Sequence, residues 1–232
     1  MNEKELRLAL VCFGGISLAV YMHGITKEVL KLARASRTYH ASPDASAHRD
    51  ARYAELAEAG PDTDTIDTEA VYFELLKRIG ERLRLRVIVD VVSGASAGGV
   101  NGVLLARALA HDLRFDPLRE MWLEKADVEE LLAPERRAAG HSKWFMRPLL
   151  WWFNRSPFAR LTPDEEMRRK LSLFVRSRWF RPPFSGHSLS TFLLDAMTAM
   201  QPDGERRSHS LLPSQQPLDL FVTVTDYYGY AQ

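Results

Sequence analysis

The sequence lacks most of the features that mark a disulfide-stabilised or zinc-binding protein. It has one cysteine, Cys12, so no intramolecular disulfide can form, and we expect this thiol to be buried by packing. Thiolate clusters are missing, and the seven histidines show no metal-ligand spacing. No metal site or cofactor is therefore predicted.

Charge and hydropathy exclude two further classes. The 31 Lys and Arg residues nearly balance the 30 Asp and Glu residues, which argues against a nucleic-acid-binding protein. No uninterrupted apolar run reaches about 18 residues, the length that a membrane-spanning helix needs. The apolar stretch at residues 8–22 contains two glycines and follows acidic residues, unlike a signal peptide. We expect a cytoplasmic protein with peripheral membrane contact.

Hydrophobic patterning predicts alternating strands and helices. The strands are expected at residues 6–13, 86–92 and 218–225, and the helices at 17–35, 67–83, 100–110 and 189–200. This alternation favours an α/β fold, with three layers and a mostly parallel central sheet. The first helix is predicted to bury the apolar positions Leu18, Met22, Ile25, Val29 and Leu32.

Two segments interrupt this pattern. Residues 36–65 are polar and contain Pro43 and Pro61, which predicts an excursion outside the core. Residues 141–187 carry ten Lys or Arg against three acidic residues, together with four of the five tryptophans. This basic aromatic insertion suits a membrane interface, although the same aromatic residues could instead pack inside a subdomain.

Residues 87–99 bring a serine, Ser96, into a turn with glycine on both sides. An apolar strand pattern precedes the turn and a helical pattern follows it, so the G-x-S-x-G sequence has the strand–turn–helix context of a nucleophile elbow. We predict that Ser96 is a catalytic nucleophile. The remaining elbow residues are Gly94, Ala95, Ala97 and Gly98.

A second glycine turn follows the first predicted strand. Gly14 and Gly15 stand between that strand and the next helix, where backbone N–H groups converge on negative charge. Acyl transfer needs such donors for the oxyanion of its tetrahedral intermediate. We therefore predict that this turn contributes an oxyanion hole.

These residues resemble the patatin-like phospholipases. The likeness rests on Gly14-Gly15-Ile16, on the glycine-rich elbow at residues 94–99 and on Asn101-Gly102 in the following helix. The stretches LALVCFGGISLAVYMHGITKEV and VTVTDYYGY are similar to a bacterial patatin-related branch with long C-terminal extensions. The resemblance implies a lipid acyl hydrolase of phospholipase or esterase type, acting on a lipid or acyl ester. It also implies a Ser/Asp dyad without a cofactor, and Ile16 as a further oxyanion-hole residue.

The sequence departs from the family pattern in two places. Phe13 occupies the first position of the glycine cluster, while Ser17 and Leu18 stand where a basic residue and a further glycine are usual. No Asp-Gly-Gly or Asp-Gly-Ala motif follows residues 218–225, so the Asp partner of Ser96 is expected beyond residue 232. Residues 1–232 are accordingly predicted to be the N-terminal portion of a truncated patatin-like domain, inactive alone.

Two alternative functions stay open. A triad α/β-hydrolase or acyltransferase would use His209 as its base. A membrane-binding regulatory domain would keep a vestigial elbow and bind anionic lipids through residues 141–187. Asp226, at the end of the last predicted strand, is expected to have a structural or site-wall role.

Overall fold

The computed structural model describes residues 3–15, 18–41, 53, 68–125, 186–201, 210–226 and 229. The chain divides into two compact units, of which the first comprises Met1–Trp122 and Ala196–Gln232 and the second Leu123–Asp195. Of the basic aromatic insertion at 141–187, only Gly186 and His187 are among the described residues.

Three parallel strands form the sheet of the first unit. They are β1 (Glu3–Cys12), β2 (Arg84–Ala95) and β3 (Asp219–Thr223), in the order β1-β2-β3. The apolar runs that predicted strands therefore form them, and the α/β class with a parallel sheet is confirmed. Because the strands are parallel, their C-terminal ends lie at one edge, where active sites of α/β sheets gather.

A bulge explains the one acidic residue in the apolar part of β2. Leu8 pairs with Val89 and Ala9 with Val91, so Asp90 is the extra residue that has no partner on β1. Its Oδ2 accepts hydrogen bonds from Arg7 Nη1 at 3.1 Å and from Gln216 Nε2 at 3.0 Å. This carboxylate is thus satisfied at a half-buried position.

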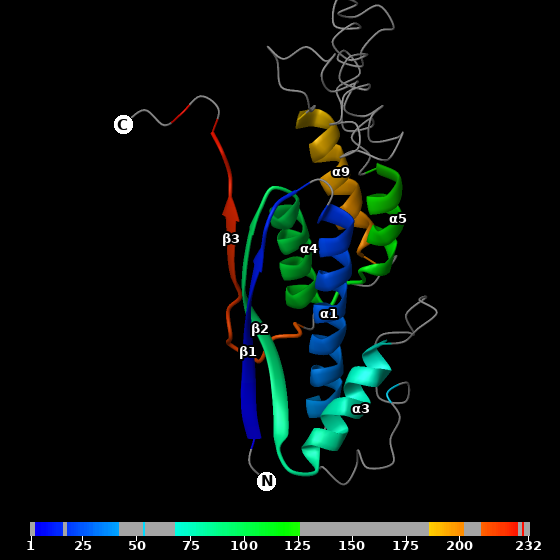
Figure 1. Cartoon of the computed structure of the whole chain (residues 1–232), viewed down its shortest axis with the longest axis vertical. Helices are drawn as coiled ribbons and strands as arrows, with labels where there is room; N and C mark the ends of the chain where they lie inside the picture. The colour runs from blue at the N-terminus through cyan, green and yellow to red at the C-terminus, as the bar shows by residue number, and fades with distance from the viewer. Residues whose placement is uncertain are drawn as a thin grey trace, which may run out of the picture. The chain divides into compact units, whose positions relative to one another are not determined.

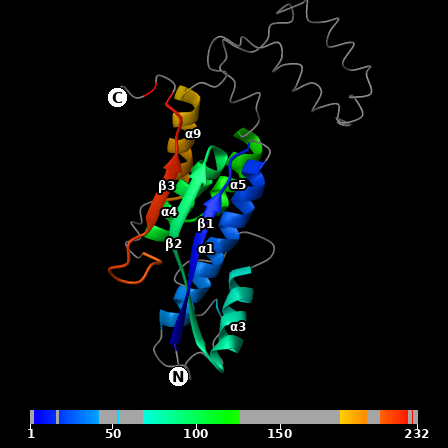
Figure 2. The ribbon, with the colours of Figure 1, turned by 60° about the vertical axis from the view of Figure 1, so that its left-hand side comes forward.

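Helices α1 (Ala19–Ala41), α3 (Thr68–Gly80) and α4 (Ala97–His111) cover one face of the sheet (Figures 1 and 2). On the other face, Val11 is 62% exposed and Phe221 is 59% exposed. Within the described ranges of this unit no helix covers that face, so they show two of the three layers expected. Two further helices are α5 (Asp116–Lys125), which sequence patterning missed, and α9 (Gly186–Ala199).

The polar excursion expected at 36–65 begins later than predicted. Residues 36–41 continue α1, because two of them have partners in the core. The Ser36 hydroxyl accepts a hydrogen bond from the Val87 N–H at 2.8 Å, and the Tyr39 ring packs edge-on against Phe73. Residues 42–52 and 54–67 lie outside the described part of the chain.

The predicted apolar face of α1 is also wrong in part. Leu18, just before the helix, and Ile25 within it are 43% and 42% exposed, whereas Lys27 and Lys31 are buried. Lys27 Nζ lies 2.9 Å from an Asp116 carboxylate oxygen on α5. A pattern that counts only apolar residues misses a buried helix face whose cations pair with acidic partners.

Arg34, another buried cation of α1, has three hydrogen-bond partners. Its Nε donates to Asp112 at 2.8 Å, its Nη1 to Glu69 at 3.3 Å and its Nη2 to the Leu113 carbonyl at 2.6 Å. Burial lowers the pKa of Arg34, but the two carboxylates outweigh that effect and raise it overall. The Tyr53 hydroxyl donates to Glu69 at 2.5 Å, and burial beside this carboxylate raises the pKa of Tyr53.

Candidate active site

Ser96 is the single residue between the end of β2 and the start of α4. Its backbone has φ 53° and ψ −130°, a conformation that non-glycine residues rarely adopt. The strand and helix enter this turn as the sequence predicted, with Gly94 and Ala95 ending β2 and Ala97 and Gly98 beginning α4. The turn therefore has the sharp strand-to-helix geometry of a nucleophile elbow.

The glycines of both turns allow close backbone approach. A Cβ built on Gly14 would lie 2.6 Å from Ser96 Cβ and 2.8 Å from the Ala95 carbonyl oxygen. A Cβ on Gly98 would overlap the Cys12 carbonyl group. The end of β1 thus passes directly against the elbow, and only glycine fits at these two positions.

The glycine turn leads from β1 into α1. Gly15 has φ +149°, and its carbonyl accepts a hydrogen bond from the Leu18 N–H at 3.0 Å. The structure therefore brings Gly14, next to Gly15, against Ser96, although 82 residues separate Gly14 from it in the chain. Ile16, the third predicted oxyanion residue, lies outside the described residues.

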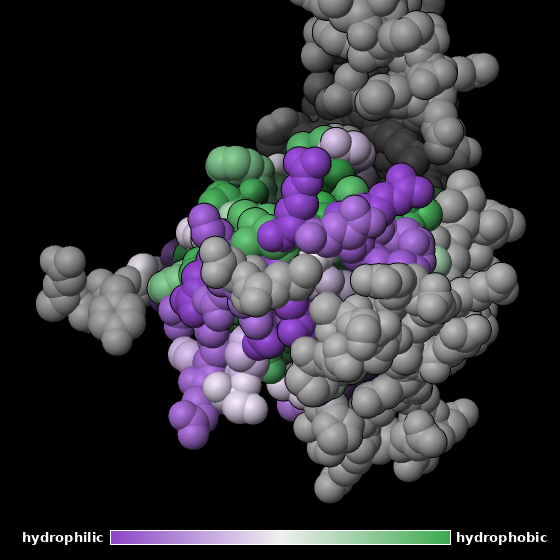
Figure 3. Space-filling model, turned by 90° about the horizontal axis from the view of Figure 1, so that it is seen from below, coloured by the Kyte–Doolittle hydropathy of each residue, from purple (hydrophilic) through white to green (hydrophobic). Residues whose placement is uncertain are grey.

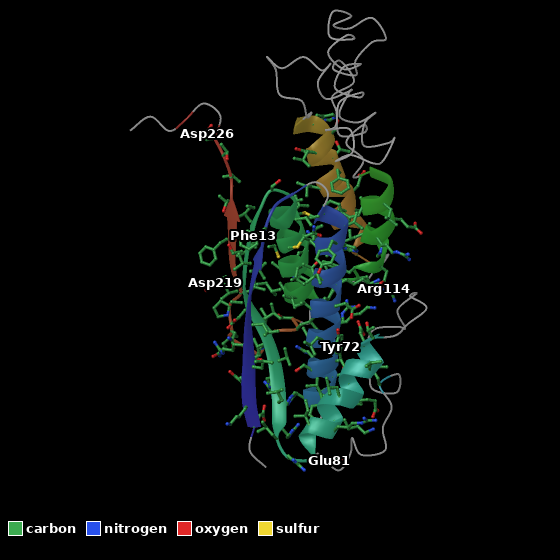
Figure 4. The ribbon with its side chains drawn as sticks, viewed as in Figure 1. Phe13, Tyr72, Glu81, Arg114, Asp219 and Asp226 are labelled. Carbon is green, nitrogen blue, oxygen red and sulfur yellow. The ribbon has the colours of Figure 1, made fainter. Side chains whose placement is uncertain are left out.

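The side chain of Ser96 is exposed and makes no capping hydrogen bond to α4. Among the residues that the structure describes, no carboxylate or imidazole forms a hydrogen bond with its hydroxyl. Figure 4 labels Asp226 beyond the end of β3, on the C-terminal side of the sheet, and Phe13 at the end of β1. The position of His209 falls outside the described ranges.

Asn101 is a buried polar residue beside the elbow, and beyond its part in the family likeness no role was predicted for it. Its side chain is on α4, is 0% exposed, and donates from Nδ2 to two carbonyl oxygens, those of Ala19 at 3.2 Å and Ala97 at 3.1 Å. The signal in the sequence is an amide within the small and apolar stretch VNGVLLARALA. Cys12, also near the elbow, is buried as predicted, which raises the pKa of its thiol.

A cavity of about 580 Å³ lies away from the elbow. Its walls include Arg34, His40 and Tyr53, together with Arg86–Ile88 from the first half of β2. Ser96 lies at the opposite end of that strand and is not among the residues that line the cavity. Figure 3 views the molecule from the side where β1 and β2 begin, and hydrophilic side chains gather there.

Comparisons with known proteins found a matching family and a partial relative. The family model described as Patatin-like phospholipase matches residues 70–227, more than half of the chain, including β2, the elbow and β3. A Mycobacterium tuberculosis protein described as an uncharacterized membrane protein is 32% identical over 134 residues, which are 57% of this chain and 11% of that protein. No solved structure matches. No helix in the described ranges is long and apolar enough to cross a membrane.

Proposed function

Because the chain belongs to the patatin-like phospholipase family, we propose that it carries the nucleophile half of a lipid acyl hydrolase of phospholipase or esterase type. The observation that carries this proposal is the backbone of Ser96, whose φ of 53° stands between a parallel strand and a helix. Such strain persists where surrounding structure enforces it, and it clusters at functional sites.

In the proposed reaction, Ser96 Oγ attacks the carbonyl carbon of an acyl ester. An Asp, which we place beyond residue 232, accepts the hydroxyl proton, and the N–H groups of Gly14, Gly15 and Ile16 bind the oxyanion. The intermediate then expels the alcohol, which takes up the proton. Water hydrolyses the acyl-enzyme, releases the fatty acid and restores Ser96.

The position of Gly14 supports its assignment to the oxyanion hole. The Cα of Gly14 is so close to Ser96 that a methyl group would not fit between them. A carbonyl attacked by Ser96 Oγ would therefore form its oxyanion next to this backbone. Lipid or acyl-ester substrate, cytoplasmic location and peripheral membrane contact through 141–187 remain predictions.

Labelling with a fluorophosphonate tests the nucleophile. In the product of the complete reading frame, we expect the probe to label the wild type and not Ser96→Ala. Ser93→Ala is the matched control. Ser93 is a half-buried serine on β2, three residues before Ser96 and ahead of the elbow. Equal labelling of wild type and Ser96→Ala would contradict the proposal.

Two further results separate the alternatives. Loss of ester hydrolysis in His209→Gln would indicate a triad enzyme in place of the dyad. Binding to anionic liposomes without ester hydrolysis in the wild type would indicate a regulatory domain with a vestigial elbow.

A further inference from the structure

We propose that Asn101 is a positioning residue that fixes the glycine turn against the nucleophile elbow. This inference rests on the proposed function, because it assigns the residue that sets the distance between Ser96 and the oxyanion donors. Asn101 itself touches neither group; it acts through the first turns of two helices.

The contacts of Asn101 join the two segments that build the site. Its Nδ2 donates to the carbonyl of Ala97, the residue after Ser96, and to the carbonyl of Ala19, the first residue of α1. The glycine turn ends at α1, where the Leu18 N–H bonds the Gly15 carbonyl. One amide group therefore connects the start of the elbow helix to the far end of the oxyanion turn.

A primary amide suits the chemistry of this bridge. A primary amide nitrogen carries two N–H donors, so it can serve both carbonyls at once, whereas a carboxylate has none and a hydroxyl has one. Around it, α4 buries Leu104 and Leu105 completely, and an apolar residue would suit packing alone. The buried Oδ1 of Asn101 has no hydrogen-bond partner within the described residues, so the two N–H bonds account for the side chain there.

The geometry also explains why the effect should appear in the chemical step. The N–H groups of Gly14 and Gly15, two of the three proposed oxyanion donors, bind charge that develops only in the transition state. A displacement of about 1 Å in such a group can lower the rate about 100-fold. Substrate contacts made elsewhere would be unaffected, so kcat should fall while KM stays nearly constant.

The test uses Asn101→Leu, which keeps the volume and removes both donors, in the product of the complete reading frame. We expect kcat for ester hydrolysis to fall about 10- to 100-fold with KM changed less than about twofold. The inhibition constant of an alkyl trifluoromethyl ketone, which forms a tetrahedral adduct with serine, should rise by the same factor as kcat/KM falls.

Thr26→Val is the matched control. The Thr26 hydroxyl is also fully buried and donates to carbonyls, those of Met22 and His23, but only within α1. Its loss should destabilise the protein comparably and leave kcat unchanged. If Asn101→Leu fails to fold, Asn101→Ser retains one donor and should give an intermediate loss of kcat.

Unchanged kcat in either folded Asn101 variant would overturn the inference, and so would an equal loss in Thr26→Val. Ser96→Ala keeps this result separate from the proposed function. Activity retained in Ser96→Ala removes the proposed function itself. An inactive Ser96→Ala with fully active Asn101 variants removes only the positioning role.

Discussion

The two ends of the sheet in the first unit are built in opposite ways. Where the strands end, backbone segments approach closely with glycine between them, and Ser96 is exposed and strained. Around the first half of β2, Arg34, Glu69 and Tyr53 are buried and joined by hydrogen bonds. Within the described residues, the Ser96 side chain makes no hydrogen bond at one end, whereas at the other end the charged groups of Arg34 and Glu69 are buried together.

This difference separates the source of the proposed activity from a source of stability. The strain at Ser96 is of the order of 1–3 kcal/mol and must be offset by the rest of the fold. The buried ion pairs help to fix α1 to α3 and to the end of α4, through Arg34, Glu69 and Asp112. Substitutions where the strands end should therefore lower activity, and substitutions around the first half of β2 should lower stability.

Among substitutions that keep the nucleophile, the largest effect on activity is expected from Gly14→Ala. The added methyl group would collide with Ser96 Cβ and displace the turn, so hydrolysis should fall by about 100-fold or more in an ester assay. Gly24→Ala is the control: nothing lies within 4 Å of its added Cβ, and alanine should stabilise α1 by about 0.5–1 kcal/mol. Equal activity in the two variants would contradict the close approach.

The largest effect on stability is expected from Arg34→Met. Removal of this cation takes the guanidinium away from the buried Glu69 carboxylate and the half-buried Asp112 carboxylate, which should cost about 3–5 kcal/mol. Hydrogen exchange of α1 and α3 peptides would measure the loss, while activity per folded molecule stays constant. The exposed Arg119→Met should change stability by no more than about 0.5 kcal/mol. Similar exchange in both variants would refute a stabilising cluster.

His40, near the first half of β2, should make a smaller, pH-dependent contribution to the free energy of unfolding. Its side chain is only 5% exposed. Burial lowers its pKa, and the cations of Arg86 and Arg84 act in the same direction. The Leu85 backbone and the Glu3 carboxylate, 3.6 Å from His40 Nδ1, act in the opposite direction, but the pKa stays below its ordinary value.

The sign of the pH effect follows from this lowered pKa. Below about pH 6.5 the unfolded chain binds a proton at His40 that the native protein does not, so the free energy of unfolding falls as pH falls. Thermal unfolding between pH 7.5 and 5.5 should show a smaller loss of stability in His40→Gln than in wild type. His111→Gln, at an exposed position, controls for loss of an imidazole. Identical slopes in wild type and His40→Gln would count against this contribution.

Much of the fold was predictable because strands and helices have different apolar periods. All three described strands and the helices α1, α3, α4 and α9 lie where patterning placed them, with ends shifted by a few residues. The buried face of α1 was not predictable, because Lys27 and Lys31 are buried by partners on other elements or by local packing. Helix α5 was missed, since its short sequence DPLREMWLEK has weak periodicity.

For the candidate site, local sequence predicted the elbow and the glycine turn separately. Glycine at positions 14, 94 and 98 indicates that another backbone segment passes close by. The sequence does not show which segment that is. The role proposed for Asn101 was likewise hidden, because one of its acceptors, Ala19, is 82 residues away. Contacts between such distant residues depend on the register of the parallel strands. That register cannot be predicted from the apolar pattern of a single sequence.

Residues near one another in the chain were enough to predict the strand–turn–helix around Ser96, the family resemblance and the α/β class. Three features became visible only in the folded chain: Gly14 lies against Ser96, Asn101 joins α1 to α4, and the buried face of α1 includes cations. Each depends on contacts between distant segments, and packing and burial select such contacts when the sheet forms.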